Sequence, residues 1–134
     1  VGVPATFIKR ANEVNLAMPA YVVKRVIAGA GGSVKGKTIV VVGVAYKANV
    51  ADTRETPAAS ITDLLREAGA VVSWHDPLVE SWRGQERSPL NGKYDGAIVV
   101  TPQPGMDLSA LVAAETPIFD CTGAYKNLPQ VEQL

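Results

Sequence analysis

The chain has 134 residues, of which 47% are hydrophobic and 19% charged, a balance typical of one globular domain with a sizeable core. Its 13 basic and 13 acidic side chains give a formal net charge of zero, so no overall field draws it to nucleic acid or to an anionic membrane surface. A single cysteine excludes an intrachain disulfide and fits a cytoplasmic protein, and no apolar run approaches the ~18 residues of a membrane span.

The N-terminal part of the chain is expected to be helical. Apolar residues keep a helical stripe over residues 4–29, and Pro19 should kink the helix or stand in the first turn of a second one. The glycine-rich stretch that follows is typical of a flexible connector or a sharp turn. We therefore divide the chain into a helix over residues 1–30, a connector over 31–37 and a domain over 38–134. Because the chain does not start with Met, we expect a fragment of a longer protein.

A regular alternation of strands and helices is expected after the connector. Residues 37–46 form a β-branched run, which is typical of a strand buried on both faces. Residues 56–70 should form a helix. Thr56 can cap its start, Pro57 suits its first turn, and Gly69 marks its end.

The rest of the chain repeats this alternation. Strands are expected at residues 70–77, 94–102 and 117–121, with a short helix at 106–115, whereas the polar residues 78–93 carry no clear pattern. Strands that alternate with helices predict an α/β fold. The expected architecture is a Rossmann-like parallel sheet flanked by helices and preceded by an N-terminal connecting helix.

One loop of this sheet carries an unusual set of side chains. Ligands of such sheets bind beyond the carboxyl ends of the strands, and loop 45–54 lies there, between the first strand and its helix. It contains Tyr46, Lys47, Asp52 and Arg54 beside a helix N-terminus, which favours anions. A guanidinium can also hold a phosphate through two hydrogen bonds. The pattern indicates a site for a phosphorylated ligand; the alternative is a solvated loop with a weak surface ion pair.

The same loop carries a family resemblance. The sequence GVAYKANVADTRETPA, residues 43–58, resembles the signature G-x-x-[FY]-K-x-x-x-x-D-x-R-x-[ST]-P-A of the UDP-glucose/GDP-mannose dehydrogenase family. The likeness continues in LREAGAVVSWHDP, residues 65–77, and upstream in ANEVNLAMPAYVV, residues 11–23. The first strand lacks G-x-G-x-x-G, which disfavours a lone dinucleotide domain. By this likeness the chain is similar to the end of the family's central helix followed by its C-terminal UDP-binding domain.

The resemblance implies a function and a set of site residues. The family enzymes oxidise the C6 alcohol of a nucleotide sugar to a carboxylate in two NAD-dependent steps. By likeness, Tyr46 and Lys47 lie beside the UDP-sugar, Arg54 faces NAD, and Asp52 orients its neighbours. Thr122 stands where the family often has an arginine that pairs with substrate phosphate. The simpler alternatives are a packed ring, a solvated lysine and an ion pair between Asp52 and Arg54.

No catalytic residue and no metal ligand are expected in this chain. The resemblance places the family's thiolate nucleophile upstream, and Cys121, at a buried strand end, should act as a small apolar residue. His75 is expected to be structural, and Asp76 to shape the turn before Pro77. The chain alone should therefore be inactive. Its expected partners are a UDP-sugar, the enzyme's own NAD domain and central helix, and further copies of itself. The alternative is a free-standing nucleotide-binding or assembly module.

Overall fold

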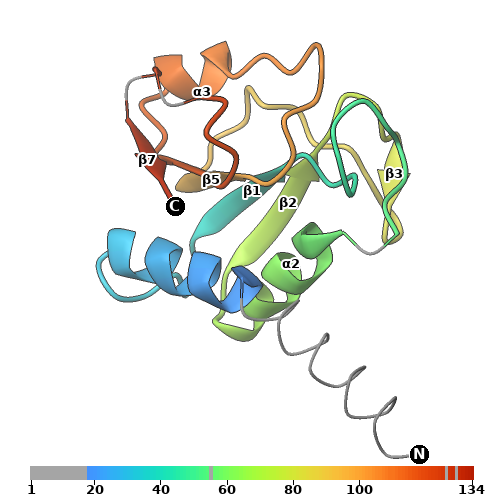
Figure 1. The fold of residues 1–134 in the computed structure, drawn as a ribbon. Coiled ribbons are helices and arrows are strands. Elements are labelled where there is room, and N and C mark those ends of the chain that lie inside the picture. Colours follow the sequence, from blue (N-terminus) through green and yellow to red (C-terminus); the bar gives the residue numbers. More distant parts are fainter. Residues whose placement is uncertain (1–17, 55, 126, 129) are drawn as a thin grey trace, which may run out of the picture.

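The computed structural model describes four stretches of the chain, which are residues 18–54, 56–125, 127–128 and 130–134. Residues 18–29 are helical, and they lie against one face of the central sheet (Figure 1). The helix expected over residues 4–17 falls outside the described residues. None of the helices in these four stretches has the length and apolar character needed to cross a membrane.

A five-stranded sheet forms the centre of the molecule, in the order β2-β1-β5-β6-β7, and every neighbouring pair is parallel. The expected Rossmann-like sheet is thus confirmed. Strand β7 was not expected, because its Val-Glu-Gln sequence carries only one β-branched residue. The strands of the sheet are β1 (Thr38–Val42), β2 (Val71–His75), β5 (Gly96–Val99), β6 (Ile118–Asp120) and β7 (Val131–Gln133).

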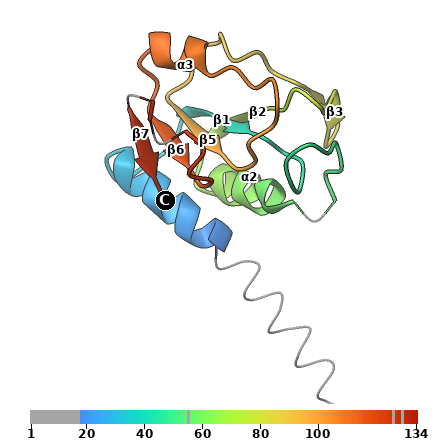
Figure 2. The ribbon, with the colours of Figure 1, turned by 45° about the horizontal axis from the view of Figure 1, so that its top comes forward.

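The two helices named in Figure 1 cover opposite faces of this sheet (Figures 1 and 2). Helix α2, Pro57–Glu67, begins as the sequence predicts, because the Thr56 hydroxyl accepts a hydrogen bond from the Ala58 N–H at 3.2 Å. Helix α3, Ser109–Ala113, is shorter than the pattern indicated. It packs on the opposite face through Leu111.

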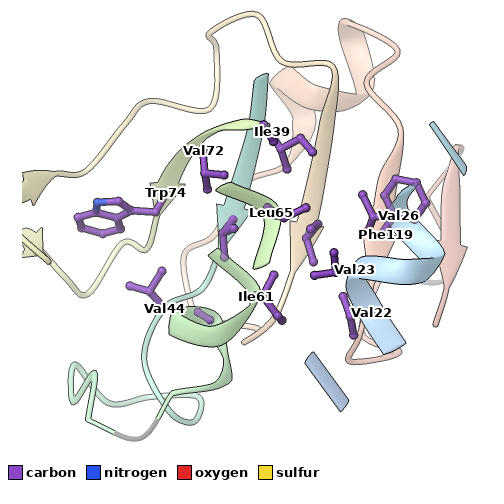
Figure 3. Close-up of a cluster of buried hydrophobic side chains, with 14 of the residues drawn as sticks. Val22, Val23, Val26, Ile39, Val44, Ile61, Leu65, Val72, Trp74 and Phe119 are labelled. Carbon is purple, nitrogen blue, oxygen red and sulfur yellow. The ribbon is translucent and has the colours of Figure 1, made fainter. Parts of the chain in front are cut away.

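Strand β1 is buried on both faces, as its β-branched run predicts. Ile39 and Val41 point toward α2 and the helical residues 18–29, whereas Val40 and Val42 point toward α3. Figure 3 shows the buried cluster on the first of these faces, where side chains of α2 and of the helical residues 18–29 meet the sheet. Its labelled members are Val22, Val23, Val26, Ile39, Val44, Ile61, Leu65, Val72, Trp74 and Phe119.

The glycine-rich stretch between the helix and β1 is a sharp turn, which was one of the two alternatives. Gly31 and Gly32 both have a positive φ, a conformation that glycine adopts without a steric penalty. Val34 is buried in the core, and the Gly36 N–H donates to the Gly69 carbonyl at 2.9 Å. These contacts fold the stretch back onto the domain.

Residues 78–93, which carry no clear sequence pattern, contain a small antiparallel ribbon at the edge of the molecule. Its strands are β3, Ser81–Trp82, and β4, Gln85–Glu86. The Trp82 ring packs edge-on against Trp74 of β2, with 5.9 Å between ring centroids. This aromatic contact attaches the ribbon to the core beside α2.

Candidate functional site

The connections from β1 and β5 run in opposite directions across the sheet. The chain passes from β1 to β2 on one side, through α2, and from β5 to β6 on the other, through α3. The two loops that leave these neighbouring strands therefore diverge at the carboxyl edge, which is where open α/β sheets bind ligands. Loop 45–54 lies at this position, as the sequence predicted.

A buried carboxylate holds the start of loop 45–54. The side chain of Asp76 is 0% exposed. Its Oδ2 accepts hydrogen bonds from the N–H groups of Val44, at 3.0 Å, and Ala45, at 3.2 Å, and its Oδ1 accepts from Leu78 N–H at 2.9 Å. Asp76 therefore shapes the turn before Pro77, as expected, and it also fixes the backbone that leads into the candidate site.

A buried glutamine completes this arrangement. Gln103 Nε2 donates to Asp76 Oδ2 at 3.1 Å and to the Val50 carbonyl at 2.7 Å, and its Oε1 accepts from the Asn49 N–H at 2.7 Å. The loop after β5 thereby holds the loop after β1 in one conformation. Sequence reasoning missed Gln103, because a glutamine between two prolines carries no pattern that predicts burial. Its only signal was its place in a loop at the carboxyl edge.

Tyr46 and Lys47 lie together on the outside of this fixed loop. Tyr46 is 46% exposed, and the Lys47 ammonium nitrogen lies 5.4 Å from the centroid of its ring, a cation–π distance. The Tyr46 N–H donates to the Asp52 carbonyl at 2.9 Å, which closes the loop upon itself. A flat ring and an ammonium group are thus presented to solvent side by side.

Asp52 and Arg54 form a two-point ion pair. Arg54 Nε donates to Asp52 Oδ1 at 3.0 Å, Nη2 donates to Oδ2 at 2.7 Å, and the Arg54 N–H donates to Oδ1 at 2.9 Å. The Arg54 side chain, and then its backbone N–H, lower the pKa of Asp52 to about 2. The Arg54 side chain remains 87% exposed, so the pair orients the guanidinium more than it stabilises the fold.

Thr122 lies in a tight turn after β6. Its hydroxyl donates to Asp120 Oδ1 at 2.6 Å and accepts from the Ala124 N–H at 3.0 Å. Burial raises the pKa of Asp120, but hydrogen bonds from the Thr122 hydroxyl and N–H and from the Tyr125 N–H outweigh it and lower the pKa overall. Strand β5 separates this turn from the end of β1, so about 10 Å of sheet lies between Thr122 and loop 45–54.

Cys121 is partly buried next to this turn. Burial, with a smaller contribution from the Asp120 charge, raises the pKa of the Cys121 thiol from an ordinary 9.0 to about 11. The thiol therefore stays protonated near neutral pH. Its environment is opposite to that of a nucleophilic cysteine, whose pKa is lowered by nearby positive charge.

This environment predicts slow alkylation of Cys121 by iodoacetamide. Below both pKa values the thiolate fraction of the folded chain should be about a hundredfold smaller than that of an ordinary thiol. The rate should rise about tenfold per pH unit and level off only near pH 11. Mass spectrometry of the modified chain measures it, with the urea-unfolded chain as control. A rate that levels off at the same pH folded and unfolded would contradict the raised pKa.

The fold and the site define a Rossmann-like α/β domain of the kind that binds nucleotides at its carboxyl edge. The comparisons with known proteins make this specific. The model of the UDP-glucose/GDP-mannose dehydrogenase family, UDP binding domain, matches residues 40–127, well over half of the chain. The chain belongs to this family, and the resemblance carried by residues 43–58 is confirmed.

Individual relatives agree with this assignment. The chain is 43% identical over 74 residues to a UDP-N-acetyl-D-mannosamine dehydrogenase of Methanococcus maripaludis, covering 54% of this chain and 17% of that protein. It is 43% identical over 54 residues to a UDP-glucose 6-dehydrogenase of Rhizobium meliloti, covering 40% of this chain and 12% of that one. A UDP-glucose dehydrogenase structure from Pyrobaculum islandicum superposes with a TM-score of 0.73 at 25% identity, covering 93% of this chain and 30% of that chain. The chain thus spans less than a third of each.

Proposed function

We propose that this chain is the substrate-binding part of an NAD-dependent UDP-sugar 6-dehydrogenase, which oxidises the C6 alcohol of the sugar to a carboxylate. The observation that carries the proposal is the fixed conformation of loop 45–54, at the point where the connections from β1 and β5 diverge. Asp76 and Gln103 hold this loop by hydrogen bonds. A loop that is already ordered loses little entropy when it binds a ligand. The relatives' names leave UDP-glucose and UDP-N-acetylhexosamines as the candidate substrates.

Tyr46, Lys47 and Thr122 are the residues that we assign to the UDP-sugar. The Lys47 ammonium supplies positive charge for a diphosphate, and the exposed Tyr46 ring supplies a flat apolar surface. The Thr122 turn lies two strand spacings away at the same edge of the sheet. A nucleotide sugar that lies along this edge would contact both loops.

Arg54 is the residue that we assign to NAD. A guanidinium that is exposed and held by a carboxylate fits the pyrophosphate of a dinucleotide, because it presents N–H groups in a fixed orientation. Asp52 is the orienting residue in this arrangement. NAD, when bound, supplies the hydride acceptor. In this chain Arg54 would bind the pyrophosphate of NAD and Asp52 would position Arg54. Neither side chain takes part in proton transfer.

We further propose how this part fits into the whole enzyme. Residues 1–30 would be the end of the central helix, 31–37 the connector, and 38–134 the UDP-sugar-binding domain. The NAD domain and the catalytic cysteine would then lie elsewhere in a cytoplasmic enzyme that assembles from several copies. The chain alone would bind UDP weakly and catalyse nothing.

UDP binding by the chain alone tests the proposal. Titration with UDP to millimolar concentration should shift the backbone amide signals of residues 45–57, followed by NMR. Lys47→Ala should weaken binding about tenfold, because a charge-assisted hydrogen bond is lost. Lys93→Ala is the matched control, since Lys93 is also exposed but precedes β5 at the opposite edge of the sheet. Equal effects of the two variants would remove the reason for assigning Lys47.

A second outcome separates binding from assembly. If UDP shifts no signal at millimolar concentration, and light scattering shows a stable oligomer, the chain is an assembly module. If the shifts lie outside loop 45–57, the nucleotide site is elsewhere. Either result would overturn the assignment of Tyr46 and Lys47.

A further inference from the structure

A cleft opens at the carboxyl end of β2, and no residue of loop 45–54 lines it. It has a volume of about 490 Å³, within the range of small-molecule sites. One wall comes from the end of β2 and the segment after β4, and the other from the loop that leads to α3. In Figure 1 the end of β2 is yellow-green, the segment after β4 is yellow and the loop that leads to α3 is orange. None of the residues assigned to the UDP-sugar or to NAD lines this cleft.

Two side chains of the cleft are held by backbone carbonyls. His75 Nδ1 lies 2.8 Å from the Ser88 carbonyl oxygen. Because a carbonyl can only accept, Nδ1 carries the hydrogen, and Nε2 of the neutral ring is left as an acceptor. Arg87 Nη1 donates to the carbonyls of Asp76, at 3.2 Å, and Pro77, at 3.0 Å. Neither Nε nor Nη2 of Arg87 bonds to any described residue, so both can bind an oxyanion.

The cleft also contains a carboxylate and an apolar surface. Asp107 lies across the cleft, and its Oδ1 accepts from the Ser109 N–H at 2.9 Å, which fixes the carboxylate. Pro77, Pro89 and Leu90 supply the apolar surface. The cleft thus combines one cationic donor group with two acceptors, His75 and Asp107. A bare anion would be attracted by Arg87 and repelled by Asp107.

We propose that this cleft is a second ligand site, for a phosphate ester that carries several hydroxyl groups, such as a sugar phosphate. The phosphate binds the free edge of the Arg87 guanidinium, and the hydroxyl groups donate to Asp107 and to His75 Nε2. The C–H face of the sugar packs on the prolines and Leu90. A ligand with both an oxyanion and hydroxyl groups offers partners to Arg87, His75 and Asp107 together. This site does not depend on UDP binding at loop 45–54.

Titration of the 134-residue chain with glucose 1-phosphate, followed by backbone amide NMR, tests this site. Shifts are expected at residues 75–78, 87–90 and 105–107. Inorganic phosphate and glucose should each bind at least tenfold more weakly, because each supplies only half of the contacts. Equal binding of either one would overturn the proposed ligand class. So would equal binding of glutamate, which carries an ammonium group in place of hydroxyls. Shifts confined to loop 45–57, or none at millimolar concentration, would overturn the site.

Variants separate this site from the UDP site. Arg87→Gln should weaken glucose 1-phosphate binding at least tenfold and leave the UDP shifts at residues 45–57 unchanged. Lys47→Ala should weaken UDP binding and leave glucose 1-phosphate binding unchanged. Arg87→Lys keeps the positive charge but loses the paired N–H donors of the guanidinium, so binding of intermediate strength is expected. This variant replaces Arg87→Gln if the latter fails to fold. Unchanged glucose 1-phosphate affinity in a folded Arg87 variant would overturn the role of this side chain.

Discussion

Replacement of Asp76 by alanine should lower the free energy of unfolding by about 3–5 kcal/mol. The carboxylate is fully buried and accepts hydrogen bonds from three backbone N–H groups and from the Gln103 amide. Alanine leaves these donors without an acceptor in the interior, where each unsatisfied donor costs about 1–3 kcal/mol before relaxation. Urea unfolding, followed by circular dichroism, measures the loss.

Asp95→Ala is the matched control for this prediction. Asp95 is exposed, and its carboxylate accepts a hydrogen bond from the Thr38 N–H at 2.8 Å. Water can replace that acceptor, so the loss should stay below about 1 kcal/mol. If Asp76→Ala loses no more than Asp95→Ala, the buried carboxylate does not hold the loop. UDP affinity supplies a second readout, because a released loop 45–54 should bind UDP more weakly even where the variant is folded.

Gly43→Ala should prevent folding, or lower the free energy of unfolding by more than about 4 kcal/mol. Gly43 has a φ of 85°, and a Cβ built there would lie 2.0 Å from the Thr101 carbonyl oxygen and 2.7 Å from the Thr101 nitrogen. Both are backbone atoms, so no side-chain rotation relieves the overlap. Relief would require the loops after β1 and β5 to separate at the proposed UDP site. Differential scanning calorimetry and urea unfolding measure the effect.

Gly84→Ala separates the two causes of this loss. Gly84 has a φ of 78°, but a Cβ there would meet nothing within 4 Å. Its alanine variant should therefore lose only about 1–2 kcal/mol, the usual penalty for an L-residue in the left-handed region. The difference between the two variants measures the contact with Thr101. Equal losses would mean that the loops after β1 and β5 separate at little cost in free energy.

The sequence predicted the elements whose signals are local. The β-branched run of β1 and the capped start of α2 were correctly placed, because burial on both faces and a Thr-Pro start leave direct marks in the sequence. The position of loop 45–54 followed from the parallel order of the strands. Strand β7 and the β3–β4 ribbon were missed, because short strands are stabilised by partners distant in sequence.

The candidate site was predicted only in part, for a related reason. Tyr46, Lys47, Asp52 and Arg54 belong to one continuous signature, and the predicted alternative of an ion pair between Asp52 and Arg54 is present. Gln103 holds the same loop from 53 residues away, counted to Val50. Contacts of this kind depend on how the loops converge at the sheet edge, and a single sequence carries no record of that convergence.

The packing of the helical residues 18–29 has a mechanical consequence. A Cβ at Gly29 would lie 2.8 Å from the Phe119 ring, so helix and sheet approach closely, and Val22, Val23 and Val26 share one core with β1. Close-packed interfaces transmit displacement instead of absorbing it. The helix and the sheet therefore behave as one rigid unit. A displacement of the helix along its axis would therefore be transmitted to Phe119 and to the turn that contains Thr122, three residues after Phe119.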